Sequence, residues 1–139
     1  MVSNGGRFVI YRSLIRPEQF ELVLARGGLA RRWKVLNGVP TDTKTRRIAV
    51  EQPTVCAPYR RFSKGAAVFS RSPAPAYTWD AGIWYSVGDS EGYRSGHLRF
   101  CLRGLLLHGR WALVRMSGEG AGRHPPWLFV LTAPPDGHE

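Results

Sequence analysis

The chain has few cysteines, no long apolar runs and little helix-forming pattern. No apolar run approaches the roughly 20 residues that a membrane-spanning helix requires. The opening residues Met1-Val-Ser-Asn-Gly-Gly lack the apolar centre of a secretion signal. Cys56 and Cys101 have neither CxxC spacing nor neighbouring His residues, so we expect two buried, reduced thiols, although a disulfide between them stays open. These absences predict a cytoplasmic protein without a membrane partner.

Acidic residues are also scarce. Ten Asp and Glu stand against twenty Lys and Arg, which gives a formal charge of +10. Residues 1–70 carry thirteen basic residues and four acids, whereas residues 71–139 carry seven and six. A high-GC coding bias would explain why seventeen of the twenty are Arg, but it would not explain the clustering. The pattern predicts a basic face, built mostly by the first half, that binds a polyanion such as nucleic acid.

Bulky apolar residues are plentiful and occur in short runs between turn residues. Apolar residues make up 43% of the 139, including five Trp, most of which we expect in a core. This length is enough for one domain with a core of its own. We predict a single domain over residues 1–139, with an ordered core over residues 8–132 and a flexible tail over residues 133–139.

The runs have the character of strands. Gly27-Gly28 predicts a hairpin, and Asp80-Ala-Gly82 predicts a turn between two short strands. Helical turns are expected only around residues 15–20 or 56–62, and loops over residues 37–46 and 70–76. We predict an all-β, mostly antiparallel fold, a small closed or partly open β-barrel with short helical turns. The expected strands are residues 8–11, 20–24, 32–36, 47–50, 77–79, 83–85, 97–102, 110–115 and 127–131.

A set of motifs in fixed order resembles the 3′-phosphoesterase family of bacterial DNA ligase D. The resemblance covers about residues 8–131 and implies a small β-barrel. It also implies an enzyme that uses manganese to remove a 3′-phosphate or 3′-ribonucleotide from DNA ends. The matching segments are Trp33-x-Val35-x-x-Gly38, Arg47-Ile-Ala-Val50, Trp79-Asp-Ala-Gly-Ile-Trp84, Gly96-His-Leu-Arg-Phe-Cys-Leu-Arg-Gly104, Leu107-His-Gly-Arg-Trp-Ala-Leu-Val-Arg115 and Trp127-Leu-Phe-Val130.

The family's first catalytic motif has the form H-D-x-x-R-x-H-Y-D-F-R-L. Its imidazoles and carboxylate would hold the metal, and its Arg would grip phosphate oxygens. In this chain the two His positions carry Ser13 and Gln19, the Asp position carries Glu21, and the Arg position carries Val23. One carboxylate with such neighbours is a poor manganese site, so we expect no bound metal or other cofactor.

The second motif, H-P-x-D-Y, is also altered. Its His position carries Val55, and only Tyr59 is kept. Of the family's basic pair, the Lys is replaced by Asn37 and the Arg remains as Arg47. The resemblance therefore implies a catalytically degenerate member, in which Glu21 and Tyr59 would be the remaining base and phosphate partner.

Three basic clusters are the candidate nucleic-acid-binding residues, and the resemblance places the second and third beside the old phosphate-binding face. Solvated strand ends are the alternative. The four histidines, among them His97 at a strand start and His108 near a turn, are expected at the surface. The clusters are Arg31, Arg32 and Lys34; Lys44, Arg46 and Arg47; and Arg60 with Arg61.

Three functions remain open at this point. The first is a non-catalytic domain that binds DNA ends in end-joining repair. The second is a protein-interaction or assembly domain that binds no nucleic acid. The third is a residual 3′-phosphoesterase with altered metal use. The sequence does not choose between DNA, RNA and a protein partner, and it does not give the oligomeric state.

Overall fold

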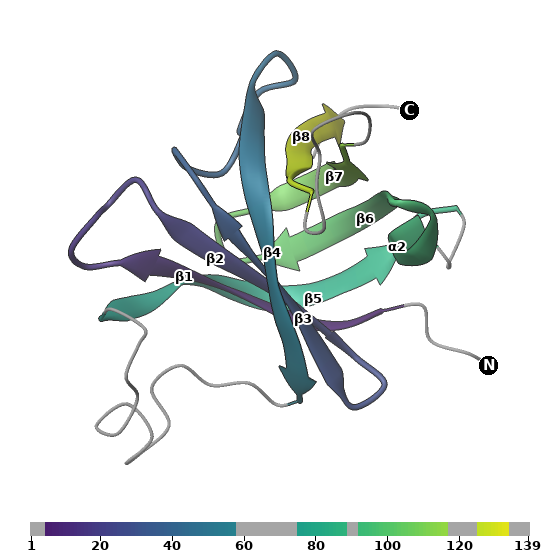
Figure 1. Cartoon of the computed structure of the whole chain (residues 1–139), viewed down its shortest axis with the longest axis horizontal. Helices are drawn as coiled ribbons and strands as arrows, with labels where there is room; N and C mark the ends of the chain where they lie inside the picture. The colour runs from purple at the N-terminus through teal and green to yellow at the C-terminus, as the bar shows by residue number, and fades with distance from the viewer. Residues whose placement is uncertain (1–4, 58–74, 89–91, 117–124, 134–139) are drawn as a thin grey trace.

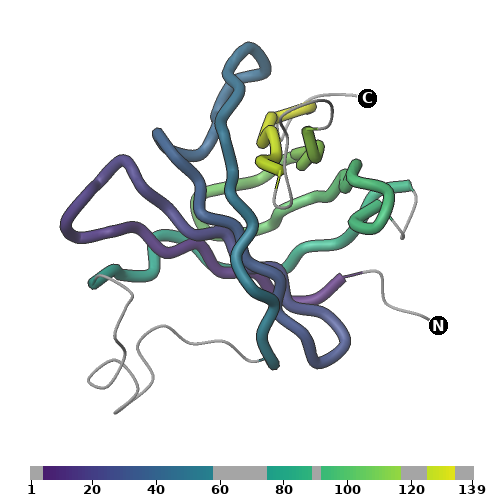
Figure 2. The backbone as a smooth tube through the Cα atoms, viewed as in Figure 1, coloured from purple at the N-terminus to yellow at the C-terminus, as the bar shows by residue number. Residues whose placement is uncertain are grey.

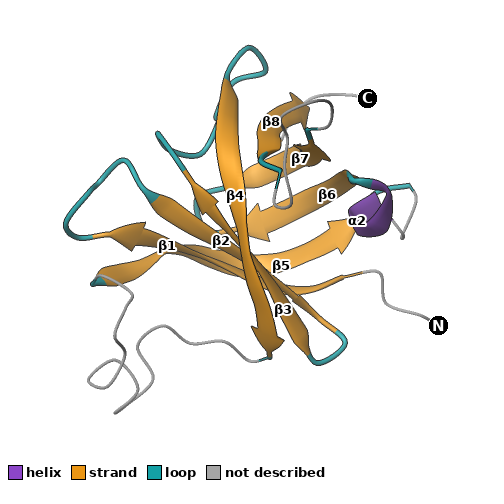
Figure 3. Cartoon of the chain, in the orientation of Figure 1, coloured by secondary structure: helices purple, strands orange, loops and turns teal. Residues whose placement is uncertain are grey.

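The computed structural model describes residues 5–57, 75–88, 92–116 and 125–133, and it is an all-β structure with a single helical turn in these ranges (Figures 1 and 3). Among these residues, no helix has the length and hydrophobicity that crossing a membrane requires. The elements are β1 (Gly5–Ser13), β2 (Phe20–Arg26), β3 (Leu29–Val35), β4 (Arg46–Cys56), β5 (Ala76–Ser86), α2 (Gly92–Ser95), β6 (His97–Gly104), β7 (His108–Arg115) and β8 (Trp127–Ala133).

The strands form a closed antiparallel barrel in the order β1-β2-β3-β4-β8-β7-β6-β5, and β5 returns to β1 (Figure 2). The predicted barrel is therefore confirmed and is closed. In this order β6 and β7 lie across the barrel from β2 and β3. β4 pairs with β8 only over Arg46–Ala49, whereas its pairing with β3 continues to Cys56. Its second half, which contains Pro53, thus has a partner strand on one side only among the described residues.

Alternation along the strands puts one set of side chains inside the barrel. The aromatic rings of Trp33, Trp111 and Trp127 are almost fully buried there, as expected of most of the tryptophans. Trp33 packs edge-on against Trp127, with ring centroids 5.6 Å apart. Because successive side chains point to opposite faces, the residues between these core positions form the outer wall.

The β2–β3 hairpin has the predicted turn. Gly27 and Gly28 have φ angles of 62° and 83°. Two consecutive positive φ angles match the right-handed twist of the flanking strands, and glycine adopts them without steric cost. The register from Phe20↔Val35 to Arg26↔Leu29 follows from this tight turn.

The predicted turn at Asp80-Ala-Gly82 is wrong, because these residues lie inside the continuous strand β5. Asp80 is 2% exposed and its carboxylate organises a different turn, between β6 and β7. Oδ1 accepts the backbone N–H groups of Leu105 at 2.8 Å, Leu106 at 3.1 Å and Ala81 at 2.9 Å, and Oδ2 accepts that of Leu107 at 2.9 Å. Asp80 thus supports a turn 25 residues further along the chain.

The helical turn also differs from the expectation. The segment from residue 15 to 19 is a turn without a helix, most of the alternative at residues 56–62 lies outside the described residues, and α2 was not anticipated.

The loop between β3 and β4 is close to its predicted range, and Ala133, which was predicted to begin the flexible tail, still belongs to β8. Residues 70–74 and 134–139 lie outside the described residues. Both cysteines are free thiols, and the expected burial is confirmed for Cys101 but is wrong for Cys56, which is exposed near the end of β4.

Candidate functional site

Five of the six catalytic-motif positions lie on one stretch of the outer wall, formed by β1, β2, β3 and β4. Ser13 ends β1 and Gln19 precedes β2, and the Ser13 N–H donates to the Gln19 carbonyl at 3.0 Å. Glu21 and Val23 point outward from β2, and Val55 lies near the end of β4. Tyr59 lies outside the described residues. We call this stretch the β1–β4 wall.

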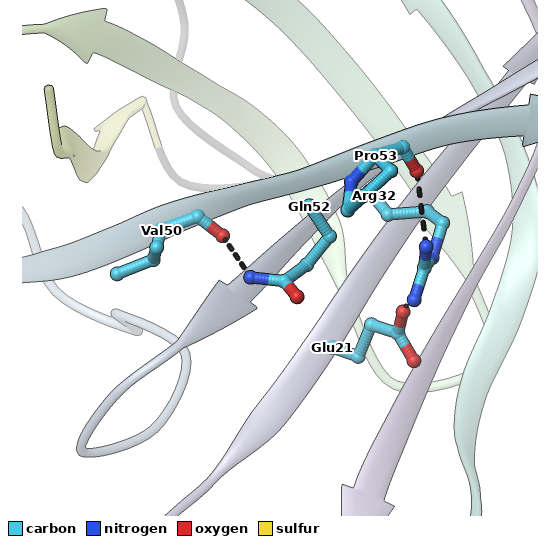
Figure 4. A network of polar contacts seen from close by, with 5 residues as sticks. All are labelled: Glu21, Arg32, Val50, Gln52 and Pro53. Carbon is cyan, nitrogen blue, oxygen red and sulfur yellow. Dashed lines mark hydrogen bonds and ion pairs between the residues drawn. The ribbon is translucent and has the colours of Figure 1, made fainter. Parts of the chain in front are cut away.

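Glu21 is a buried carboxylate that forms an ion pair with Arg32 of β3 (Figure 4). Arg32 Nε lies 2.8 Å from Glu21 Oε2, and Arg32 Nη1 donates to the Pro53 carbonyl at 3.0 Å. Nearby, the Gln52 amide donates to the Val50 carbonyl at 3.1 Å. Glu21 and Arg32 therefore neutralise each other on the wall, and the guanidinium also connects β3 to β4.

Val23 and Val55 are part of a small apolar cluster on the same wall. The buried members are Val23, Tyr11, Ala30 and Ala76, and Val55 packs against them half-buried. A groove of about 500 Å³ continues from Val23 and Tyr11 toward the glycines of the β2–β3 turn. Where the family motif has an Arg and a His, this surface is thus apolar.

The hydroxyl of Ser13 is also engaged. It accepts the backbone N–H groups of Ile15 at 3.2 Å and Arg16 at 2.9 Å. Such a contact stabilises the turn that leads from β1 toward β2. Within the described residues, no three His, Cys, Asp or Glu side chains gather closely enough to hold a metal ion.

The first basic cluster is divided between the two faces of β3. Arg32 and Lys34 point outward, whereas Arg31 points into the barrel and lies 3.6 Å from the centroid of the Tyr93 ring. Neighbouring residues of a strand always point to opposite faces. Tyr93, from α2, stacks on Trp127, and its hydroxyl donates to the carboxylate of Glu51. Arg31 is therefore part of an interior network and not of the outer wall.

We expect Tyr93 to make stability sensitive to alkaline pH. Burial, followed by the hydrogen bond to Glu51 and the charge of Glu51, raises the pKa of Tyr93 above 10.0, and Arg31 partly opposes this. The folded protein holds the phenol proton more tightly than the unfolded chain. This contribution is complete below about pH 10 and is lost as the pH rises through the folded pKa. In urea unfolding at rising pH, the midpoint should fall more steeply for wild type than for Tyr93→Phe. Parallel profiles would contradict the prediction.

The second cluster is placed at the β3–β4 loop and the start of β4. Lys44 and Arg46 are exposed, and Arg47 is half-buried on the inward side. Arg47 Nε is buried and has no hydrogen-bond partner among the described residues. Arg60 and Arg61 lie outside the described residues. Of the candidates that the structure describes, Lys34, Lys44 and Arg46 are therefore the freely exposed cations.

The basic residues of the C-terminal half were not among the predicted site residues. Arg99, Arg103 and Arg110 are exposed on β6 and β7, and His97 and His108 are exposed beside them, as expected of the two histidines. His124 and His138 lie outside the described residues. The exposed positions of these two strands alternate with core positions, which is the signal that could have identified them.

Known proteins with similar sequences identify the family of this chain. Residues 15–115 match the family model described as the DNA ligase D 3′-phosphoesterase domain. The multifunctional non-homologous end joining protein LigD of Pseudomonas aeruginosa is 30% identical over 112 residues, which are 80% of this chain and 13% of that protein. Its counterpart from Mycobacterium bovis is 23% identical over 119 residues, 86% of this chain and 16% of that protein. The chain therefore spans about one seventh of these relatives.

Proposed function

The chain belongs to the DNA ligase D 3′-phosphoesterase domain family, and we propose that it binds DNA ends in the cytoplasm without manganese-dependent catalysis. The relatives are named for end joining. The chain has twenty basic residues and ten acids, and this net positive charge favours binding to a phosphate backbone. The proposed lack of catalysis is supported by one observation, the ion pair between Glu21 and Arg32.

The residues on the β1–β4 wall do not fit manganese. Manganese prefers carboxylate, imidazole and water ligands. Glu21 is neutralised by Arg32, the Ser13 hydroxyl accepts two backbone N–H groups, and Val23 and Val55 offer no donor atom. These side chains therefore support no metal-dependent catalytic step at this wall.

The test is a binding and a phosphatase assay on one substrate, a primer–template with a 3′-phosphate. We expect DNA affinity that falls steeply with salt, because each contacted phosphate releases counterions. We expect no release of phosphate above the protein-free rate at any manganese concentration, for wild type or for Glu21→Ala.

Two outcomes would contradict this proposal. Manganese-dependent phosphate release that Glu21→Ala abolishes would identify a residual 3′-phosphoesterase. Absent or salt-independent DNA binding, with a stoichiometric protein partner that survives nuclease treatment, would identify an assembly domain.

A further inference from the structure

A group of four side chains surrounds Cys101 on the outer surface of β5, β6 and β7. In the strand register, Tyr85 and Arg110 lie opposite Cys101 on its two neighbouring strands. Arg99 and Arg103 lie two residues to either side of Cys101 on β6. Each of these two is thus a diagonal neighbour of both Tyr85 and Arg110, at about 7–8 Å between backbones. We call Tyr85, Arg99, Arg103 and Arg110 the β5–β7 face.

Among the described residues, the strands of this face carry positive charge and no exposed carboxylate. β6 and β7 contain no Asp or Glu, and the single acid of β5 is Asp80, which is buried and occupied by four backbone N–H groups. At these diagonal positions the guanidinium groups of Arg99 and Arg103 each repel that of Arg110. A bound polyanion would remove that repulsion, so the arrangement is favourable with a phosphate-bearing partner.

The aromatic member of the face is positioned beside the cations. Tyr85 is 37% exposed, and Arg103 forms a side-chain hydrogen bond with it that raises the pKa of Arg103. A tyrosine ring among arginines offers a stacking surface for a base next to contacts for the backbone. This combination is typical of surfaces that bind single-stranded nucleic acid.

The β1–β4 wall, on the opposite side of the barrel, differs at its centre. There the half-buried Arg32 is paired with Glu21, and Val23 and Val55 form an apolar surface. The exposed cations among the predicted binding residues of this wall are therefore Lys34 on β3 and Lys44 and Arg46 near the start of β4. β6 and β7 lie across the barrel from β2 and β3. A strand bound at the β5–β7 face would therefore lie on the far side of the barrel from the family's catalytic motif.

We propose that the β5–β7 face binds the backbone of single-stranded DNA through Arg99, Arg103 and Arg110, with a base stacked on Tyr85. This inference rests on the proposed DNA binding and adds its location, which differs from the motif-bearing wall. It also accounts for binding in a family member whose motif positions do not fit a metal.

The test compares two triple variants that remove equal charge from the full chain. The probe is a fluorescent oligodeoxythymidylate, and anisotropy is measured over a range of salt. Arg99→Ala with Arg103→Ala and Arg110→Ala should weaken binding by about a hundredfold. It should also make the slope of log affinity against log salt shallower by about 2, at roughly 0.7 for each single-strand phosphate contact. Lys34→Ala with Lys44→Ala and Arg46→Ala should weaken binding less than threefold.

A second pair of variants tests the stacked base. Tyr85→Ala should weaken binding by about tenfold, because stacking on one aromatic ring contributes on that order, whereas Tyr85→Phe should bind like wild type. A triple Arg→Lys variant of the face should keep the salt slope, and circular dichroism checks folding of each protein. Equal losses in the two triple variants, or a larger loss from the β1–β4 wall, would overturn this location while leaving DNA binding intact. Absence of binding by wild type would overturn both proposals.

Discussion

Asp80→Ala is expected to lower the free energy of unfolding by about 3–5 kcal/mol, the range for removing one partner from a buried charged network. Four backbone N–H groups lose their acceptor, three of them in the β6–β7 turn at Leu105, Leu106 and Leu107. The side chain is 2% exposed, so water does not readily replace the carboxylate. Urea unfolding followed by tryptophan fluorescence measures the change, with an unchanged m-value if unfolding stays two-state.

Two comparisons make the Asp80 prediction specific. Asp80→Asn can keep an oxygen at Oδ1, which accepts three of the N–H groups. It replaces Oδ2 by an NH₂ group, which cannot accept the Leu107 N–H, so the loss should be about half as large. Asp42 also accepts turn N–H and hydroxyl groups, but at an exposed position, so Asp42→Ala should have a much smaller effect. If Asp80→Ala and Asp42→Ala cost the same, the carboxylate does not support the turn as described.

Arg32→Met is expected to cost about 2–3 kcal/mol, because it leaves the carboxylate of Glu21 buried without its cation. The pair is less than fully buried, with side-chain exposures of 15% for Arg32 and 9% for Glu21, so the cost lies below that of a deep pair. The Pro53 carbonyl also loses a donor. The measurement is the same urea unfolding at neutral pH.

Replacing both partners should recover most of that loss. In Arg32→Met with Glu21→Leu the charges are gone together, and apolar side chains of similar volume join the cluster around Val23. The double variant should therefore be within about 1 kcal/mol of wild type. A double variant as unstable as the single one would show that Glu21 has another essential partner on this wall.

The strands were predictable because their signals are local. Alternation of apolar and polar residues marks each run, and Gly27-Gly28 marks the tightest turn whatever surrounds it. The failure at Asp80-Ala-Gly82 has the opposite cause. These residue types favour turns locally, but the Asp80 side chain is bound by N–H groups 25 residues away, which local preference does not contain.

The candidate site was less predictable for the same reason. That Ser13, Glu21, Val23 and Val55 share a wall follows from the register of four strands and not from any one run. Arg31 and Arg32 are neighbours in sequence, yet one contacts Tyr93 inside the barrel and the other contacts Glu21 outside. A count of charges along the chain cannot separate the two faces of a strand.

The one-sided half of β4 limits how a second protein could associate with this domain. An open strand edge is the usual template for adding a strand from another chain. Among the described residues β4 has such an edge beyond Ala49, but Pro53 has no N–H to donate and interrupts the ladder there. Continuous backbone pairing with a neighbouring chain is therefore disfavoured at this edge, and recognition of a protein partner here would depend on side-chain complementarity.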